Sequence, residues 1–370
     1  MLRCDPPVID ALVARAEIQL EQAHTSALAT ASQEQLAGAA LGWLRLGRED
    51  RAIQTIVGML RRCDSQPQDP DADARALVAS HWGTRVLGDA VTQAAAAPIA
   101  RAAARLVENG LTQEPRPSLR DAAWRAHGLA CAADLARRIS APAFVETLNV
   151  AAQCAMLDFE ASFWSDSLDA FSARPGGLDA DALIPCSIGM LASTEGRAER
   201  SLRATLLPNS LARPDELNGL VARAQLGMPL AEDLATMLAA SELAFDDPGR
   251  RLDAAIFALT GLRLATGPDL DATWMRLRPC LPRGVTQMRI EGLALDGWTC
   301  SLEVAAAGNE DPADLRGVYR LVARTPPTLR WRQLVVHQGD HTFVAAAIDG
   351  NSIELPPREA PVTSLDARAR

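Results

Sequence analysis

Asp71 and Asp73 begin a predicted helix that carries His81 and Trp82 farther along. A carboxylate near an indole ring suits acid–base chemistry on a sugar, because the ring stacks on the sugar while the carboxyl group exchanges a proton. Asp73 is therefore a candidate catalytic residue and Trp82 a candidate substrate-binding residue. The structural alternative is that aspartates at a helix start cap backbone N–H groups and favour the helix dipole.

Glu160 precedes Trp164 by one helical turn, and a Gly-rich loop is predicted to follow at 165–178. A carboxyl group that loses water beside aromatic rings has a raised pKa, as a general acid requires. Glu160 is thus a second candidate catalytic residue, and Trp164 is a candidate platform for a sugar ring. The alternative is that Phe163 and Trp164 pack the end of a helix.

A third group, Arg213-Pro214-Asp215-Glu216, stands where another helix is predicted to start. Glu216 is a candidate catalytic residue, and Arg213 and Asp179 are candidate substrate-binding residues. Two carboxyl groups hydrolyse a glycosidic bond with inversion when they lie about 6.5–9.5 Å apart, and with retention at about 5 Å. Proline followed by acids is also ordinary chemistry for a helix start.

Signatures of other enzyme classes are absent from the sequence, which has no Gly-x-Ser-x-Gly elbow, P-loop, GxGxxG or CxxC motif. The seven cysteines are widely spaced, so we expect reduced, mostly buried thiols rather than a disulfide framework or a zinc site. His337 and His341 flank a predicted turn, which favours a solvated hairpin. We therefore expect no cofactor and no metal.

The composition narrows the classes of partner. The 370 residues carry a net charge of −9 and contain no lysine, which argues against nucleic acid, because phosphates are bound by basic surfaces. No apolar run is long enough to cross a membrane, and the first residues lack the apolar core of a signal peptide. We expect a cytoplasmic protein with no membrane partner; the oligomeric state is not predicted.

Helix signals position most of these candidate residues. Ser32 and Ser118 stand where N-caps are expected, and Gly47 stands at a helix stop. Alternating helices with short connections pair as hairpins, which close into a toroid or stack as an open solenoid. Helices are predicted at 8–21, 32–46, 50–62, 72–87, 96–108, 119–138, 143–159, 180–192, 195–206, 214–226, 230–243 and 248–264.

The hydrophobic period changes to two after Pro282. Turn dipeptides such as Asp296-Gly297 separate the alternating runs, and this pattern is typical of antiparallel hairpins. We predict a helical domain at 1–282, a small sandwich-like β-domain at 283–357 and a disordered tail at 358–370. Strands are predicted around 288–291, 300–304, 319–322, 331–336, 342–348 and 352–355.

The segment around this change of period resembles a known family. Leu259-Thr260-Gly261-Leu262 is followed by Met275-Arg276-Leu277-Arg278-Pro279-Cys280-Leu281-Pro282 and then by the strand-like Met288–Leu293. This order resembles the barrel-to-sandwich junction of six-hairpin (α/α)6 glycosidases, especially the amylo-α-1,6-glucosidase or glycogen-debranching type. Phe163-Trp164 and Asp73 resemble parts of earlier hairpins in that family, so the resemblance spans most of 40–305.

The resemblance implies a mainly α fold, in which an (α/α)6 toroid of about six helical hairpins is followed by a small antiparallel β-domain. It also implies a carbohydrate ligand and paired-carboxylate acid–base hydrolysis of an oligosaccharide or polysaccharide. The sequence departs from the family at 209–218, where the Tyr-His-x-Gly-x-x-Trp-Pro stretch is missing. This departure motivates the alternative of a catalytically inactive scaffold that binds a partner protein or a glycan.

Overall fold

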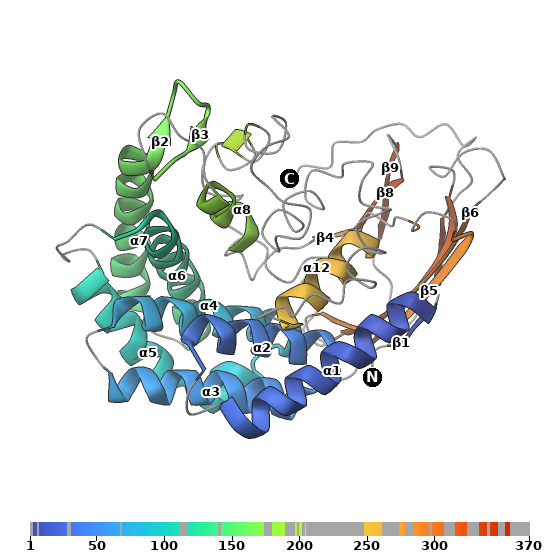
Figure 1. Ribbon diagram of the computed structural model, residues 1–370, viewed down its shortest axis with the longest axis horizontal. Helices are drawn as coiled ribbons and strands as arrows, with labels where there is room; N and C mark the ends of the chain where they lie inside the picture. Colours follow the sequence, from blue (N-terminus) through green and yellow to red (C-terminus); the bar gives the residue numbers. More distant parts are fainter. Residues whose placement is uncertain are drawn as a thin grey trace.

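The chain folds into a large helical part and a smaller β part, as predicted (Figure 1). The computed structural model describes residues 3–5, 7–27, 31–66, 69–110, 117–139, 142–173, 180–188, 197, 200–201, 204, 248–260, 274–277, 281, 285–295, 298–306, 315–323, 333–338, 341–346 and 352–355. The helices are α1 (Pro7–Ala27), α2 (Gln33–Arg45), α3 (Glu49–Ser65), α4 (Pro70–Leu87), α5 (Ala90–Gly110), α6 (Leu119–Arg138), α7 (Pro142–Phe163), the short η1 (Ala180–Leu183), α8 (Ile184–Ile188) and α12 (Pro248–Thr260).

The helical part has two layers. The inner layer follows the order α12, α2, α4, α6 and α8, in which each helix packs against the next, while α1, α3, α5 and α7 lie outside it. Trp43, Trp82 and Trp124 come from α2, α4 and α6, and their exposed fractions are 0%, 2% and 1%. Helices that are apolar on nearly every face belong inside a protein. This layering is that of an α/α toroid.

The helices of the inner layer begin at one end, here called the start rim. Glu34 in the first turn of α2 lies 3.4 Å from Arg120 of α6 and 3.5 Å from Arg250 of α12. Arg75 of α4 lies 3.0 Å from Asp121 in the first turn of α6. Helix starts carry partial positive charge, so parallel helices whose starts lie together repel one another. The acids and ion pairs of the start rim offset that repulsion.

Capping residues set the helix ends much as predicted. Ser32 accepts from the backbone N–H of Gln35, whose side chain accepts in turn from the backbone N–H of Ser32. Ser118 caps α6 in the predicted way. The cap of α4 is Asp69, which accepts from the backbone N–H of Asp71 at 3.1 Å. Asp71 and Asp73 therefore lie in the first turn of α4 and leave their carboxylates to other partners.

Three glycines let α2 and α12 pack unusually closely. A Cβ atom at Gly249 of α12 would lie 1.8 Å from the carbonyl oxygen of Gly38 on α2. A Cβ atom at Gly42 would lie 2.6 Å from the Cα of Gly249. Backbone contact at this range leaves no room for any side chain. The spacing of Gly38 and Gly42, one helical turn apart, thus fixes where α12 crosses α2.

Two sheets make up the β part. The five-stranded sheet has the order β1-β5-β6-β7-β10 with antiparallel pairing, and the other has the order β4-β8-β9 with β4 and β8 parallel. The strands are β1 (Arg3–Asp5), β4 (Trp274–Leu277), β5 (Gln287–Leu295), β6 (Trp298–Ala306), β7 (Leu315–Ala323), β8 (Gln333–Gln338), β9 (His341–Ala346) and β10 (Ser352–Leu355). All six predicted strands are present.

Strands β1 and β4 were not predicted. Arg3 pairs with Glu291 and Asp5 with Arg289, so residues from the start of the chain complete a sheet whose other strands come from its last third. Strand β4 begins before the predicted boundary at Pro282 and pairs with β8. The domain boundaries remain predictions, and the predicted tail at 358–370 lies outside the described residues.

The predicted loop and helices that follow α7 are only partly described by the structure. The predicted loop at 165–178 contains a short hairpin of β2 (Trp164–Ser165) and β3 (Ala170–Phe171). The predicted helix at 180–192 is described only as far as α8. The predicted helices at 214–226 and 230–243 lie outside the described residues. Among the helices that are described, none combines the length and the apolar character that a membrane crossing requires.

Candidate functional site

Two of the predicted site residues, Glu160 and Trp164, lie at the end of α7. Glu160 lies in the last turn of α7, and Trp164 begins β2 directly after it. The Trp164 ring stands nearly perpendicular to that of Phe171, with 5.2 Å between their centroids, and its Nε1 donates to Asp166 at 2.8 Å. The apolar packing and this hydrogen bond hold the indole in one orientation.

Two arginines complete what is here called the α7-end cluster: Glu160, Trp164, Arg197 and Arg200. Arg197 forms an ion pair with Glu160 and places its guanidinium 5.2 Å from the centroid of the Trp164 ring. Arg200 lies 5.0 Å from the same centroid and pairs with Asp169 at 3.1 Å. Cation–π attraction therefore adds to charge pairing. These arginines were not among the predicted site residues, although their spacing by three residues places both on one face of a helix.

The α7-end cluster lies toward the start rim. Helix α7 begins soon after α6 ends and packs along it, and Figure 1 shows the two helices side by side. The two helices must therefore run in opposite directions, which puts the end of α7 near the start of α6. In the second turn of α6, Arg125 donates to Asp71 from Nε at 2.6 Å and from Nη2 at 3.1 Å.

Asp73 lies at the start rim but is enclosed. Its exposed fraction is 0%, and it accepts from Nη2 and Nε of Arg105 at 2.7 and 3.1 Å. Burial raises the pKa of the Asp73 carboxyl, although the hydrogen bonds from Arg105 oppose that shift. Arg105 also reaches Asp64 at 2.9 Å. Asp73 therefore joins α4 to α5 and has no open side that a substrate could reach in this structure.

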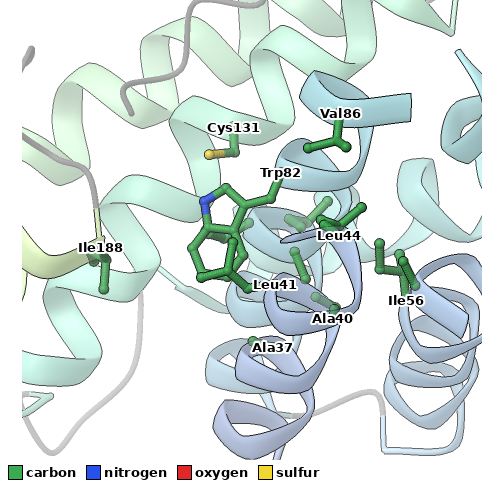
Figure 2. Close-up of a cluster of buried hydrophobic side chains, with 14 of the residues drawn as sticks. Ala37, Ala40, Leu41, Leu44, Ile56, Trp82, Val86, Cys131 and Ile188 are labelled. Atoms are coloured by element: carbon green, nitrogen blue, oxygen red, sulfur yellow. The ribbon is translucent and has the colours of Figure 1, made fainter. Parts of the chain in front are cut away.

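Trp82 is a core residue in this structure. Its ring meets that of Trp124 edge-on, with 6.3 Å between centroids and 64° between planes. Figure 2 shows Trp82 among Leu41, Val86 and Cys131, and its exposed fraction is 2%. The indole that was predicted to contact a sugar therefore fills the space between α4 and α6.

His81 forms a buried pair that the sequence did not predict. Its Nε2 lies 3.1 Å from Oδ2 of Asp134 on α6, and both side chains are buried. Asp134 also accepts an ion pair from Arg137 at 3.2 Å. The spacing of 53 residues between His81 and Asp134 carries no local signal. This pair lies in the core, so it links α4 to α6 rather than facing solvent.

Three predicted site residues, Asp179, Arg213 and Glu216, lie outside the described residues. The α7-end cluster therefore contains two of the seven predicted site residues, Glu160 and Trp164, while Asp73 and Trp82 lie in the interior. Within the described part of the chain, no three histidine, cysteine or acidic side chains gather as metal ligands do.

Comparisons with known proteins show the type of fold. No protein-family model matches the sequence, and no curated protein matches it either. The chain is similar in structure to the GH78 family rhamnosidase of Bacillus sp. GL1, with a TM-score of 0.56 and 11% identity over 87% of this chain and 41% of that one. The α-L-rhamnosidase of Dictyoglumus thermophilum has a TM-score of 0.56 and 10% identity over 91% of this chain and 45% of that one.

These likenesses establish an α/α-toroid fold, in agreement with the predicted fold class. At such identities they show the fold alone. The chain spans less than half the length of either rhamnosidase. The two structures are rhamnosidases, so the finer resemblance to the glycogen-debranching type gains no support from them.

Proposed function

We propose that this chain is a glycoside hydrolase-like protein that binds an oligosaccharide or polysaccharide at the α7-end cluster. The observation that carries the proposal is the contact network that joins the half-buried Glu160, Arg197 and the Trp164 ring. An indole beside a carboxyl group is a common arrangement for holding a sugar ring near an acid. The glycosidase-like fold supports the same class of ligand.

In this proposal Glu160 donates a proton to the leaving oxygen of the glycosidic bond. In the free protein, Arg197 holds the Glu160 carboxylate in an ion pair. A sugar that stacks on Trp164 must displace Arg197 or Arg200 from the ring. Displacement of Arg197 would release Glu160 from its ion pair. Ligand binding would thus leave the carboxyl group free to face the glycosidic oxygen.

The second carboxylate is assigned to Glu216 rather than to Asp73. Asp73 is enclosed by Arg105 and is fully buried, so it serves as a link between helices. The separation of Glu160 and Glu216 would decide whether hydrolysis inverts or retains the anomeric configuration. The resemblance at the junction favours an α-1,6-glucosidic bond, whereas the neighbours in structure favour an α-L-rhamnoside.

Activity on a panel of glycans tests the proposal. The panel contains an aryl α-L-rhamnoside, an aryl α-glucoside and an α-1,6-linked glucan. We expect Glu160→Gln and Glu216→Gln each to lower kcat by about 10²–10⁴-fold, the range that acid–base catalysis supplies. Glu146→Gln is the control, because Glu146 is an exposed acid on the same helix. If the wild type is active and both variants keep its full activity, the proposal is contradicted.

The second candidate function is a scaffold that binds a glycan without hydrolysing it. The described acids of the start rim favour it, because Glu34, Asp71, Asp73 and Asp121 each pair with an arginine. Such pairing suits a stable scaffold better than a reactive acid. Calorimetry with the same glycans decides between the two: binding that Trp164→Ala weakens at least tenfold, with no product formed, would favour the scaffold. Absence of any glycan binding would contradict both functions.

A further inference from the structure

The outer helix α7 presents an uncharged stripe to solvent, here called the α7 seam. Its members are all exposed, and they follow one another at alternating steps of four and three residues. They are Ala143, Thr147, Val150, Cys154, Leu157 and Ala161. The 4–3 alternation keeps all of them on one face of a helix, which is the spacing that two helices use when they wind around each other.

The opposite face of α7 is already in use. Leu148, Ala151 and Phe159 are buried against the protein, with exposed fractions of 0%, 5% and 2%. Val150 and Leu157, in contrast, are exposed by 55% and 68%. Together with Ile18 they form the set of large apolar side chains that stand exposed among the described residues. Helix α7 is therefore apolar on two faces, of which the fold covers one.

The charges beside the α7 seam indicate what kind of surface it fits. Helix α7 carries the acids Glu146, Asp158 and Glu160 and has no lysine, arginine or histidine. Glu146 and Asp158 are exposed on the borders of the α7 seam. In helix pairs, residues on these borders choose the partner by charge. A second copy of this chain would bring acids against acids, and an anionic membrane would also be repelled.

We propose that the α7 seam is a docking surface for a partner protein that offers an amphipathic helix with arginine or lysine along both borders of its apolar face. The apolar face of that helix covers Val150, Cys154 and Leu157, and its basic borders meet Glu146 and Asp158. The two helices lie nearly parallel or antiparallel, with a crossing angle of about 20°. This surface lies on the outside of the helical part, whereas the proposed carbohydrate site lies at the end of α7.

A labelled synthetic helix tests the proposal with the full chain. The probe is a peptide of about three heptads that has leucine at both seam positions and arginine at both border positions. One comparison peptide has glutamate at the borders, and another has the arginine peptide's composition in scrambled order. Fluorescence anisotropy measures binding to the wild type and to Val150→Ser, Leu157→Ser and the matched control Ile18→Ser, which removes an exposed apolar residue from α1.

We expect the arginine peptide to bind the wild type and Ile18→Ser equally, and to bind Val150→Ser and Leu157→Ser at least tenfold more weakly. We expect neither comparison peptide to bind. Equal binding by all variants would overturn the proposal, because it would show attraction to net charge alone. A wild-type dimer in sedimentation equilibrium that Leu157→Ser dissociates would also overturn it, because the occupant would then be a second copy.

Discussion

Arg45 and Asp253 form an ion pair inside the helical part, with 2.6 Å between Nε of Arg45 and Oδ1 of Asp253. The exposed fractions of the two side chains are 1% and 9%. The pair joins α2 to α12, which lie far apart in the sequence. Water hardly reaches either side chain, so the attraction between the two charges is little screened.

Asp253→Asn should lower the free energy of unfolding by about 3–5 kcal/mol, because it removes one partner of a buried ion pair. Replacing both residues, as Arg45→Met with Asp253→Leu, should restore much of that loss. Urea unfolding measures all three proteins. The control is Glu21→Gln, which breaks the pair of Glu21 with Arg51, whose side chains are 42% and 40% exposed. It should cost at most about 1 kcal/mol, and an equal loss in both pairs would contradict the prediction.

Gly249→Ala should prevent α12 from packing on α2. The new methyl group would lie 1.8 Å from a backbone oxygen of Gly38, and neither backbone can move without separating the helices. We expect a loss of soluble protein or a large drop in Tm. Gly58→Ala is the matched control, because a Cβ atom there meets nothing within 4 Å. It should raise stability by roughly 0.5–1 kcal/mol through its higher helix propensity.

The three cysteines whose surroundings are described should differ in their reactivity toward alkylating reagents. Burial raises the pKa of Cys63 and of Cys131 far above the usual range, so neither forms the reactive thiolate at neutral pH. Cys154 is exposed on α7. Iodoacetamide at pH 8 followed by peptide mass spectrometry should find Cys154 modified in the native protein and Cys63 and Cys131 modified only after unfolding. Early modification of Cys131 would show that the core between α4 and α6 opens.

Asp64 should make stability depend on pH. Hydrogen bonds from Arg101, and then from Arg105, lower the pKa of Asp64 below its ordinary value of 3.8. The unfolded chain therefore binds a proton more readily than the folded one, so the stabilisation is complete above about pH 4 and disappears as the pH falls through the folded-state pKa. Asp64→Asn should cost at most about 1 kcal/mol at pH 7, because Arg101 is largely exposed.

The cost of Asp64→Asn should shrink as the pH falls through the folded-state pKa of Asp64, because the wild-type carboxyl then becomes protonated as well. Urea unfolding of both proteins from pH 7 down to pH 2 measures the difference. In an Arg101→Gln background the same substitution should cost less, since one of its hydrogen-bond donors is already gone. A difference that stays constant with pH would contradict the prediction.

Local patterns in the sequence predicted those parts of the fold that depend on near neighbours. Ser32 and Ser118 cap helices as expected, because a cap involves residues only three apart. Alternation and turn residues likewise predicted β5 to β10. The pairing of β1 with β5 could not be predicted, because three residues carry too little pattern to identify a distant partner.

The candidate site was predicted only where its members are close in sequence. Glu160 and Trp164 stand one helical turn apart, and the fold keeps them together. The position of Asp73 at a helix start suggested that it is accessible. In the structure it is enclosed by Arg105, which lies 32 residues later in the sequence. Trp82 was predicted to contact a sugar, because the residues around it in the sequence do not reveal that α2 and α6 cover its ring. Burial is decided by such distant partners.

The pairing of β1 with β5 has a consequence for synthesis on the ribosome. Residues 3–5 are synthesised before the helices, whereas β5, the strand that pairs with them, is synthesised after α12. Until β5 has been synthesised, β1 has no strand to pair with. Contacts between residues so far apart in the sequence also form slowly. Completion of this sheet is therefore among the last events of folding, and a nascent chain that stalls before β5 would leave β1 without its partner.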